Sequence, residues 1–465
     1  MSKRTPEKHD GVNRRTFLTA GGIAALGAVA GCASKGPMVE TGPVETAGDR
    51  KNPRVTTYRT LGRTGFQVSD LGMGAGSIAD SNVVRYAYDH GINIFDTAES
   101  YGNGDSETKI GGAMPFMDRE KIFIVTKLDI SEKPDEQNII DRFHQSLARL
   151  QTPYADALYS HGIADAELVD YEPFIKACNT LKAEGKLKHM GISSHGPRGD
   201  EPDSMEAVLG KAAEHGGYDV MLLSYGFLNK EEGERVLAAC KARNVGTTIM
   251  KSATGLVEMP VLDFDNPSEQ VQGWFEYLEG NGSTHEEAKE RITSYFARNK
   301  PEFEKSYAAT KPFMDRHGIK TQEELRFKSL QWVLGNPDAH TIVPSMSSFD
   351  DLDRLLPLSG TRLSSNGQLF LDQYAKAFAT TACRFSCTEC IGACPHDVPV
   401  NTILRYAYYF KNQGRQKHAM QKYARLAGAN AAACLDCSAP CVGACPHGVQ
   451  VQAQLFNAHG RLAMA

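Results

Sequence analysis

Short apolar runs alternate with longer segments of helical periodicity through the middle of the chain, from residue 70 to residue 345. Eight runs have the length and composition of buried strands, and they lie at Asp70–Gly74, Ile92–Asp96, Ile122–Lys127, Ala155–Ser160, Lys188–Ser193, Tyr218–Ser224, Gly246–Lys251 and Thr341–Ser345. One intervening segment, 135–150, predicts a helix because its apolar residues share one face; these are Ile139, Ile140, Phe143, Leu147 and Leu150. Eight strands that each precede a helix close most economically into a parallel (β/α)8 TIM barrel.

Two local signals accompany the predicted barrel, which we assign to residues 54–360. Residues 58–68 contain two glycines that bracket a turn, which predicts a β-hairpin ahead of the first strand. Thr321 and Glu324 have the spacing of a capping box, which predicts a helix over Leu325–Leu334.

The segment 252–320 interrupts the alternation. It is rich in charge, too long for one connection, and has a helix-start signal at Thr284–Glu287. It predicts a helical insertion over the barrel mouth, either a lid or partner surface or a structural excursion without a role of its own.

Length and composition add a second domain but no nucleic-acid partner. At 465 residues the chain exceeds a single barrel, and 41% hydrophobic residues suffice for two cores. The 51 basic and 56 acidic residues nearly balance, which does not indicate binding to nucleic acid.

The first 32 residues predict a targeting segment. The pair Arg14-Arg15, followed by a weakly apolar stretch from Leu18 to Ala30, resembles a twin-arginine export signal. Val29-Ala30-Gly31-Cys32 resembles a lipobox, in which Cys32 would carry a lipid anchor, but residues 28–30 equally fit an ordinary cleavage site. Residues 33–53 predict a flexible linker. The resemblance implies a periplasmic protein, or one anchored outside the cytoplasmic membrane or on the outer membrane; an unprocessed leader is the alternative.

Four polar residues end or follow three consecutive predicted strands. Asp96-Thr-Ala-Glu-Ser-Tyr101-Gly-Asn-Gly-Asp-Ser-Glu107 resembles the aldo/keto reductase signature. Lys127 ends the third strand and His161 follows the fourth, so the four side chains should converge at one rim. The family resemblance implies interconversion of a small carbonyl compound and its alcohol, with Tyr101 as general acid.

The roles of the other three follow from the weakness of a phenol, with a pKa of about 10, as an acid or base near neutrality. A buried Lys127 ammonium would favour the phenolate, Asp96 would position the lysine, and His161 would bond the substrate oxygen. Taken singly, each residue also has an ordinary structural interpretation, as a helix cap, a strand end, a barrel histidine or a loop residue. Their joint arrangement favours catalysis.

A nicotinamide site is implied by resemblance at three further strand ends. Ser193 and Ser194 lie in the segment that holds the carboxamide, although asparagine is usual at Ser194. Lys251 closes the seventh strand, and the loop after the eighth resembles a phosphate site that includes Ser345, Ser347 and Asp351. No Lys or Arg between Ser345 and Asp353 would neutralise a 2′-phosphate, which favours NAD over NADP(H). The alternative is that these segments only close the barrel.

Residues 361–465 hold two blocks of four cysteines, each ending in Cys-Pro. The blocks are Cys383, Cys387, Cys390, Cys394 and Cys434, Cys437, Cys441, Cys445. They resemble a two-cluster ferredoxin with two [4Fe-4S] clusters, where the fourth cysteine of each block binds the other cluster. This rule groups Cys383, Cys387 and Cys390 with Cys445, and the second trio with Cys394. The helical segment 401–427 between the blocks makes the domain resemble the α-helical dicluster ferredoxins that follow some aldo/keto reductase barrels.

The cysteine pattern departs from a ferredoxin by one extra residue in each loop. The gaps are three, two, three and two, three, three residues, against two, two, three. Zinc and disulfides are the alternatives. Cys178 and Cys240 lie in predicted helices and are expected to be buried packing residues.

Three functions remain open at this point. The barrel could exchange hydride between a nicotinamide and a carbonyl or alcohol. It could instead serve as scaffold for clusters that exchange electrons with a partner protein outside the cytoplasm, since nicotinamides react with electron pairs and clusters with single electrons. A non-catalytic binding protein is the third interpretation.

Overall fold

The computed structural model describes residues 52–463 apart from 198–202, 253–261, 266, 268–270, 272–273, 276–277, 280–281, 317–318, 379–382, 385–386, 413–415, 427 and 436. The predicted export signal, the predicted lipid site Cys32 and residues 33–51 of the predicted linker lie outside the described residues. The chain divides into two units after Gly42, and all that follows concerns the second unit, Pro43–Ala465. Within the described part of the chain, no helix has both the length and the apolar composition to cross a membrane.

Eight parallel strands form the main sheet, each beside the strand that follows it in the chain. They are β3 (Met73–Gly74), β4 (Ile94–Asp96), β5 (Phe123–Leu128), β6 (Ala155–Ser160), β7 (Leu187–Ser194), β8 (Val220–Ser224), β9 (Gly246–Met250) and β10 (Thr341–Ile342). Parallel bridges from Leu71 to Ile342 and from Gly74 to Ser345 join the first strand to the last. The sheet therefore closes, and the predicted barrel is confirmed.

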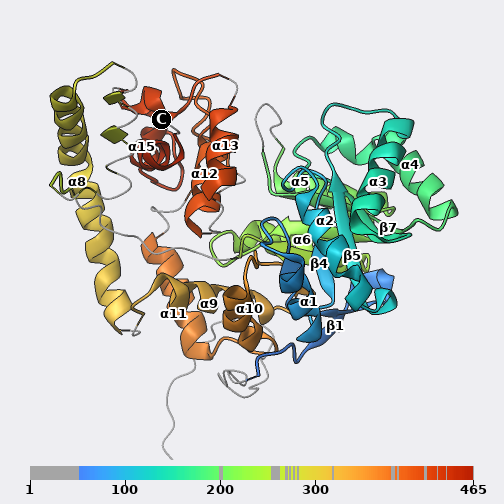
Figure 1. Ribbon diagram of the computed structural model, residues 1–465. Coiled ribbons are helices and arrows are strands. Elements are labelled where there is room, and N and C mark those ends of the chain that lie inside the picture. Colours follow the sequence, from blue (N-terminus) through green and yellow to red (C-terminus); the bar gives the residue numbers. More distant parts are fainter. Residues whose placement is uncertain are drawn as a thin grey trace, which may run out of the picture. The chain divides into compact units, whose positions relative to one another are not determined.

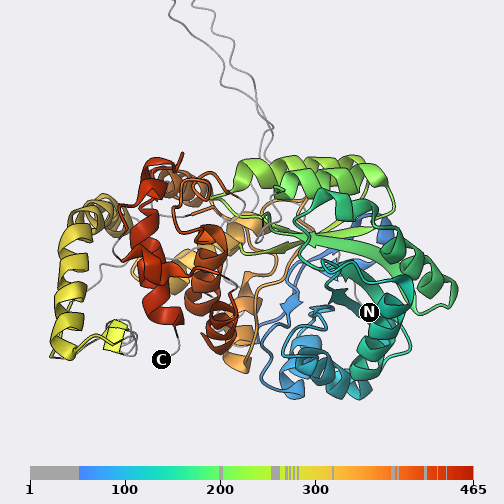
Figure 2. The ribbon, with the colours of Figure 1, turned by 90° about the horizontal axis from the view of Figure 1, so that it is seen from above.

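Helices connect the strands and cover the outside of the barrel (Figures 1 and 2). They are α1 (Ser81–Asp89), α2 (Asp105–Ala113), α3 (Glu136–Leu150), α4 (Glu172–Ala183), α5 (Met205–His215), α6 (Lys230–Ala242), α9 (Gln322–Leu334) and α10 (Phe349–Leu355). The predicted capping box is present, because Thr321 and Glu324 bond each other's backbone at the start of α9. The predicted hairpin is also present, with β1 (Tyr58–Thr60) antiparallel to β2 (Gln67–Ser69).

Cys178 on α4 and Cys240 on α6 are fully buried in the apolar layer between helices and sheet. Burial raises the pKa of the Cys240 thiol to about 12. Both are packing residues, as predicted.

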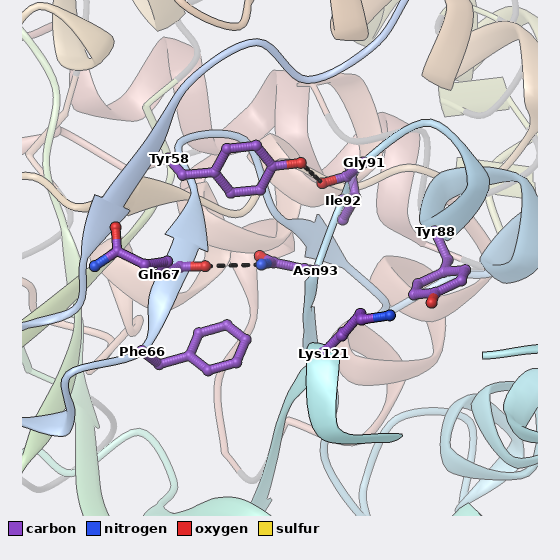
Figure 3. A pocket seen from close by; sticks show the side chains of 8 residues that line it. All are labelled: Tyr58, Phe66, Gln67, Tyr88, Gly91, Ile92, Asn93 and Lys121. Carbon is purple, nitrogen blue, oxygen red and sulfur yellow. Dashed lines mark hydrogen bonds between the residues drawn. The ribbon is translucent and has the colours of Figure 1, made fainter. Parts of the chain in front are cut away.

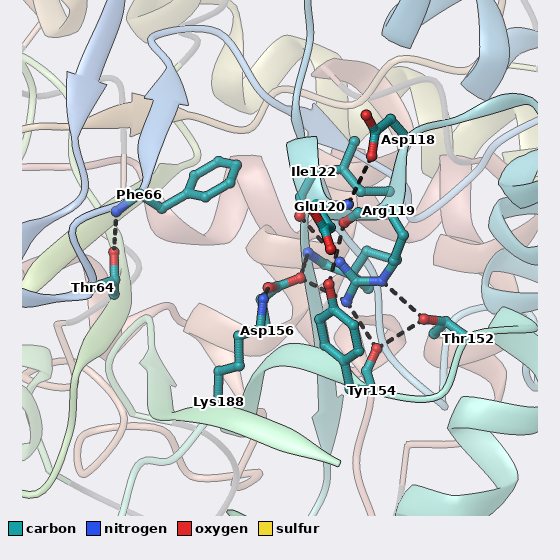
Figure 4. Close-up of polar contacts among 11 residues, drawn as sticks. Thr64, Phe66, Asp118, Arg119, Glu120, Ile122, Thr152, Tyr154, Asp156 and Lys188 are labelled. Carbon is teal, nitrogen blue, oxygen red and sulfur yellow. Dashed lines mark hydrogen bonds and ion pairs between the residues drawn. The ribbon is translucent and has the colours of Figure 1, made fainter. Parts of the chain in front are cut away.

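A polar network lies at the N-terminal end of the barrel strands (Figure 4). Asp156, near the start of β6, pairs with Arg119 at 2.8 Å and with Lys188 at 3.0 Å. Both cations also lie against the Tyr154 ring, at 3.8 and 4.2 Å from its centroid. A hollow near this end is lined by residues of β2 and of the loops before β4 and β5 (Figure 3). It lies away from the C-terminal strand ends, where a barrel's chemistry occurs.

The described part of the insertion contains α8 (His285–Arg316). The Thr284 hydroxyl accepts from the Glu287 amide at 3.3 Å, and the Glu287 carboxylate accepts from the Thr284 amide at 2.8 Å. This reciprocal pair confirms the predicted helix start. Trp274 lies 5.1 Å from both Phe296 and Phe456, measured between ring centroids. Because Phe456 belongs to the C-terminal domain, the insertion contributes to a shared apolar cluster with that domain.

Helix α11 (Ser365–Phe378) packs against α8 and α9. The cysteine-bearing C-terminal domain is also helical, with α12 (Val400–Asn412), α13 (Gln416–Ala424), α14 (Pro440–Gly443) and α15 (Val451–Leu462). The prediction that 401–427 is helical is confirmed for residues 401–412 and 416–424, which belong to two helices, α12 and α13, packed on each other. A single helix of that length would extend for roughly 40 Å and carry half of its apolar face beyond so small a core. Folded back, both helices contribute to one core, which includes Ile403, Leu404, Ala419, Tyr423 and Leu455.

Candidate active site

The loop after β4 carries Asp96 to Tyr101 and then into α2. Asp96 is the last residue of β4. Gly102, Asn103 and Gly104 follow Tyr101 with φ values of 62°, 56° and 87°, a left-handed conformation that glycine and asparagine adopt at least cost. This reversal lets the chain enter α2 at Asp105 directly after Tyr101 and holds the tyrosine at the rim.

Asp96 and Lys127 form an ion pair at the C-terminal ends of neighbouring strands. Lys127 Nζ lies 2.6 Å from Asp96 Oδ1 and donates to the Thr97 carbonyl at 2.6 Å. The lysine side chain is inaccessible to solvent and that of Asp96 is 5% exposed. Burial raises the pKa of the Asp96 carboxyl, and the Lys127 ammonium offsets part of that rise. Asp96 Oδ2 is buried without a hydrogen-bond partner among the described residues, which is costly and typical of functional sites.

Tyr101 and His161 complete this group. Lys127 Nζ lies 5.0 Å from the centroid of the Tyr101 ring, and the rings of Tyr101 and His161 are 5.6 Å apart at 77°. His161 directly follows β6, and its amide continues the strand ladder to Leu128. The structure thus brings together the four predicted catalytic residues at one rim. A phenol, an imidazole and a buried ammonium in contact can deliver or accept a proton at a substrate oxygen.

Glu107 is a buried carboxylate next to the four catalytic candidates. It was not among the residues predicted to be functional. It lies on α2, accepts a hydrogen bond from Thr126 on β5, and pairs with Arg149 on α3 at 2.6 Å. Because Thr126 directly precedes Lys127 on β5, these contacts connect the strand that carries the lysine to α2 and α3. The signal was present in the sequence, because Glu107 belongs to the signature that begins at Asp96.

Ser193 and Ser194 end β7, both almost fully buried. The Ser193 hydroxyl accepts from the Gly162 amide at 2.8 Å and donates to the Ser160 carbonyl at 3.3 Å. Ser194 Oγ accepts from the Gly196 amide at 3.3 Å. Ser193 is therefore engaged with the β6 side of the rim, and Ser194 with its own loop.

Lys251 follows β9 with a φ of 57°, unusual for a residue with a side chain. Its ammonium is enclosed although part of the residue is accessible, and burial together with the nearby Arg405 guanidinium lowers its pKa well below the ordinary value. Strained backbone at a strand end is common where a side chain is needed in one place.

The predicted phosphate loop after β10 fits a nucleotide less well. The Ser347 amide donates to Asp351 at 2.9 Å, so a carboxylate holds the position that a phosphate would need. Asp351 also pairs with Arg354 at 3.1 Å. Ser345 bridges to Gly74 in the barrel ladder. The ends of β7 and β9 offer the hydroxyl groups of Ser193 and Ser194 and the amino group of Lys251 to a nicotinamide nucleotide, whereas this loop requires rearrangement to receive phosphate.

The cysteines of the C-terminal domain fall into two neighbouring sets. Burial, with smaller contributions from the Cys390, Cys387 and Cys445 thiols, raises the pKa of Cys383 to about 12. Burial, with smaller contributions from Cys441, Cys394 and Cys437, likewise raises the pKa of Cys434 to about 12. In each set, three cysteines of one block interact with the fourth cysteine of the other block. Gln452 on α15 fixes the second loop by donating to the Cys434 and Cys437 carbonyls at 2.6 and 2.7 Å.

The described cysteines are all free thiols. As the described side chains lie, no group of three or more His, Cys, Asp or Glu residues is set to hold a metal ion.

The sequence profile of the aldo/keto reductase family matches residues 79–366. This is more than half of the chain, and the protein therefore belongs to the aldo/keto reductase family. The members of this family are oxidoreductases.

Individual relatives match over unequal lengths. The aldo-keto reductase YhdN of Bacillus subtilis is 24% identical over 332 residues, 67% of this chain and 91% of its own length. A probable aldo-keto reductase of Glycine max is 32% identical over 156 residues, 30% of this chain and 44% of its own. A putative voltage-gated potassium channel subunit beta of Schizosaccharomyces pombe is 32% identical over 30% of this chain and 46% of its own. The chain thus spans under half the length of the latter two relatives.

Two solved structures are also similar. An aldo-keto reductase from Bacillus halodurans is 22% identical with a TM-score of 0.48, covering 69% of this chain and 97% of its own. One from Klebsiella pneumoniae in complex with NADPH is 20% identical with a TM-score of 0.46, covering 69% and 95%.

Proposed function

We propose that the barrel interconverts a small carbonyl compound and its alcohol by hydride exchange with a nicotinamide nucleotide. The observation that carries this proposal is the buried Asp96–Lys127 pair beneath the Tyr101 ring, with His161 at the ring edge. Four groups from three strand ends meet where a barrel's reactions take place.

Tyr101 donates the proton to the carbonyl oxygen as hydride reaches the carbon, and takes it back in the reverse direction. The Lys127 ammonium, 5.0 Å from the ring centroid, stabilises negative charge on the phenol oxygen. Asp96 keeps the ammonium in place at 2.6 Å. His161 donates to the substrate oxygen and holds it beside Tyr101. The nicotinamide, when bound, supplies or accepts the hydride.

Ser193, Ser194 and Lys251 are the residues that we propose hold the nucleotide. The acidic Asp350 and Asp351 in the loop after β10 disfavour a 2′-phosphate, so NAD is the expected form, with NADP(H) as the alternative. A similar structure from Klebsiella pneumoniae contains NADPH, which makes the comparison of both nucleotides worthwhile.

We propose further that the eight C-terminal cysteines bind two [4Fe-4S] clusters. Support comes from the two sets of mutually close thiols, which coincide with the ferredoxin rule that the fourth cysteine of each block crosses over. Cys441 of the other set also contributes to the raised pKa of the Cys390 thiol, so the two clusters would be neighbours. They would exchange single electrons with a redox partner.

The sequence of the N-terminus supports export by the twin-arginine route, with a lipid anchor at Cys32 as one outcome. That route carries folded proteins, which suits clusters inserted before export. A second candidate function follows: the clusters transfer electrons outside the cytoplasm and the barrel acts as a scaffold.

Anaerobic purification followed by iron, sulfide and nucleotide analysis tests both halves of the proposal. We expect about eight irons and eight sulfides per chain, as two cubanes require, together with NADH-dependent reduction of an aldehyde. Cys387→Ala should lose about half of the iron, whereas Cys178→Ala, the matched control, should retain it. Full iron without any nucleotide-dependent turnover would favour the second candidate.

A further inference from the structure

Helix α12 presents three side chains at intervals of four residues, Asn401, Arg405 and Tyr409. Residues with this spacing lie on one helix face, and eight residues advance the helix by about 12 Å. The three therefore form a continuous strip along α12.

This strip contacts the barrel at two strand ends. Arg405 Nη2 donates to the Pro197 carbonyl at 2.7 Å, and its Nη1 lies 2.8 Å from His195 Nδ1. Asn401 Nδ2 donates to the same Pro197 carbonyl at 3.3 Å. Tyr409 meets the other strand end, with its ring centroid 5.6 Å from Lys251 Nζ. Because β8 lies between β7 and β9, α12 reaches across three adjacent strand ends.

Arg405 is the anchor of this contact. It is 3% exposed and Asn401 is 2% exposed, so both are enclosed by the contact that they make. A guanidinium is removed from water at a large cost that only well-directed hydrogen bonds offset. Its two bonds to the loop after β7 offset part of that cost.

The loop that Arg405 holds is continuous with the proposed nicotinamide segment. His195 and Pro197 directly follow Ser193 and Ser194, and Gly196 turns the chain with a φ of 84°. The Gly196 amide donates back to the Ser194 hydroxyl. A shift of His195 or Pro197 is therefore transmitted to Ser194 within three residues.

The opposite face of α12 belongs to the core of the C-terminal domain, where Val400, Ile403 and Leu404 are buried. The helix begins six residues after Cys394, whose sulfur accepts from the Val398 amide at 3.4 Å. The position of the strip thus depends on the fold of the cysteine-bearing domain.

From this arrangement we infer that Arg405 is a positioning residue that locks α12 across the nicotinamide segment. The inference rests on the proposed function. The nucleotide is then enclosed between the barrel and α12, and is retained as a tightly held group instead of being exchanged at each turnover. Retention would let a protein folded before export carry its nucleotide with it.

The test uses the full-length, anaerobically purified protein loaded with NADH and freed of excess by desalting. Excess NAD is added, and release of bound NADH is followed by its fluorescence. We expect Arg405→Ala to release NADH at least tenfold faster than wild type, and Arg405→Lys to fall between them because lysine keeps the charge but not the two-point geometry. The exposed Arg425 supplies a matched control, Arg425→Ala, which should behave as wild type.

Two further measurements separate positioning from general damage. Cluster absorbance and the melting temperature of Arg405→Lys should match wild type. In a double-variant cycle, His195→Ala should add little to Arg405→Ala, since both remove the same contact. Equal NADH release from wild type and both Arg405 variants would overturn the inference and leave the proposed function intact.

Absence of NADH binding in wild type would instead contradict the proposed cofactor and, with it, retention. Positioning is then decided by hydrogen exchange of the amides of residues 193–196 without nucleotide. Exchange that is at least tenfold faster in Arg405→Ala supports it, and unchanged exchange overturns it.

Discussion

The two halves of the barrel rim are built differently. On the β4–β6 half, the charged groups Lys127 and Asp96 pair with each other within the barrel and are only 31 residues apart in the chain. On the β7–β9 half, His195 and Lys251 are met by a helix of another domain, and Arg405 lies 210 residues from His195. The first half can form as soon as neighbouring strands pair, whereas the second is complete only after the C-terminal domain has docked.

This difference assigns separate tasks to the two halves. Proton transfer needs groups fixed to within a fraction of an ångström, and the buried pair on two paired strands supplies that rigidity. Nucleotide retention needs a closure that involves a second element, and α12 supplies it. Variants of the first half should therefore change turnover, and variants of the second should change binding.

The largest expected effect is that of Tyr101→Phe. Removing the phenol oxygen removes the proton donor, so kcat should fall about a thousandfold, within the range for lost general acids. NADH release should be unchanged, because α12 and the β7 segment are untouched. Single-turnover kinetics measure the fall. Tyr58→Phe, at the opposite end of the barrel, is the control, and unimpaired turnover in Tyr101→Phe would contradict the assigned role.

Lys127→Met should lower the free energy of unfolding by about 3 kcal/mol or more, because it leaves the buried Asp96 carboxylate without its partner. Urea unfolding measures the loss. Adding Asp96→Asn should recover part of it, since the uncompensated charge disappears. Lys241, 66% exposed and paired with Asp338, gives the contrast: Lys241→Met should cost less than about 1 kcal/mol. A similar loss of unfolding free energy in both variants would mean that the buried Asp96–Lys127 pair stabilises the fold no more than an exposed pair does.

Mild acid should weaken the C-terminal domain, whose docking completes the second half of the rim. Burial lowers the pKa of His459, which bonds Tyr423 in the C-terminal core, to about 4. Above pH 6.5 the histidine is neutral in both folded and unfolded chains. As the pH falls towards 4 only the unfolded chain takes up the proton, which should cost about 2 kcal/mol of stability by pH 5.

Urea unfolding at pH 7.5 and pH 5 checks this effect. His459→Gln should lose about 2 kcal/mol less than wild type between the two values. An identical loss in both proteins would show that His459 does not titrate in this way.

The smallest effect is expected for Ser194→Ala. Loss of one hydroxyl from the nicotinamide segment should weaken NADH binding about fivefold, equivalent to about 1 kcal/mol, while kcat changes little. Titration of NADH fluorescence measures the Kd. Ser329→Ala, which removes a buried hydroxyl bonded within α9, should leave it unchanged. A fall in kcat at constant Kd in Ser194→Ala would contradict the assignment of turnover to the first half of the rim and of binding to the second.

The features that the sequence predicted are local ones. Strand positions follow from short apolar runs, and Asp96, Lys127 and His161 follow from their places at strand ends, so the barrel topology alone brings them together. The grouping of the cysteines into two crossed ligand sets stays a prediction, which rests on their repeated spacing.

The docking of α12 was not predictable, because nothing in the local pattern around Arg405 distinguishes a buried interdomain arginine from a solvated one. The division of 401–427 into α12 and α13 was not predicted either, although Gly414, a residue type that favours the end of a helix, lies between them in the sequence. Glu107 was visible in the signature, but its partner Arg149 is 42 residues away on α3.

Transfer of deuterium tests the central claim most directly. The full-length protein is supplied with 4-nitrobenzaldehyde and with NADH that carries deuterium at both hydrogen positions of nicotinamide C4, and the alcohol is analysed by mass spectrometry. Direct hydride exchange at the Tyr101 site predicts one deuterium on the carbinol carbon of the product. An alcohol whose new hydrogen comes only from the solvent, or no NADH-dependent alcohol at all, would contradict the account and favour electron transfer through the clusters.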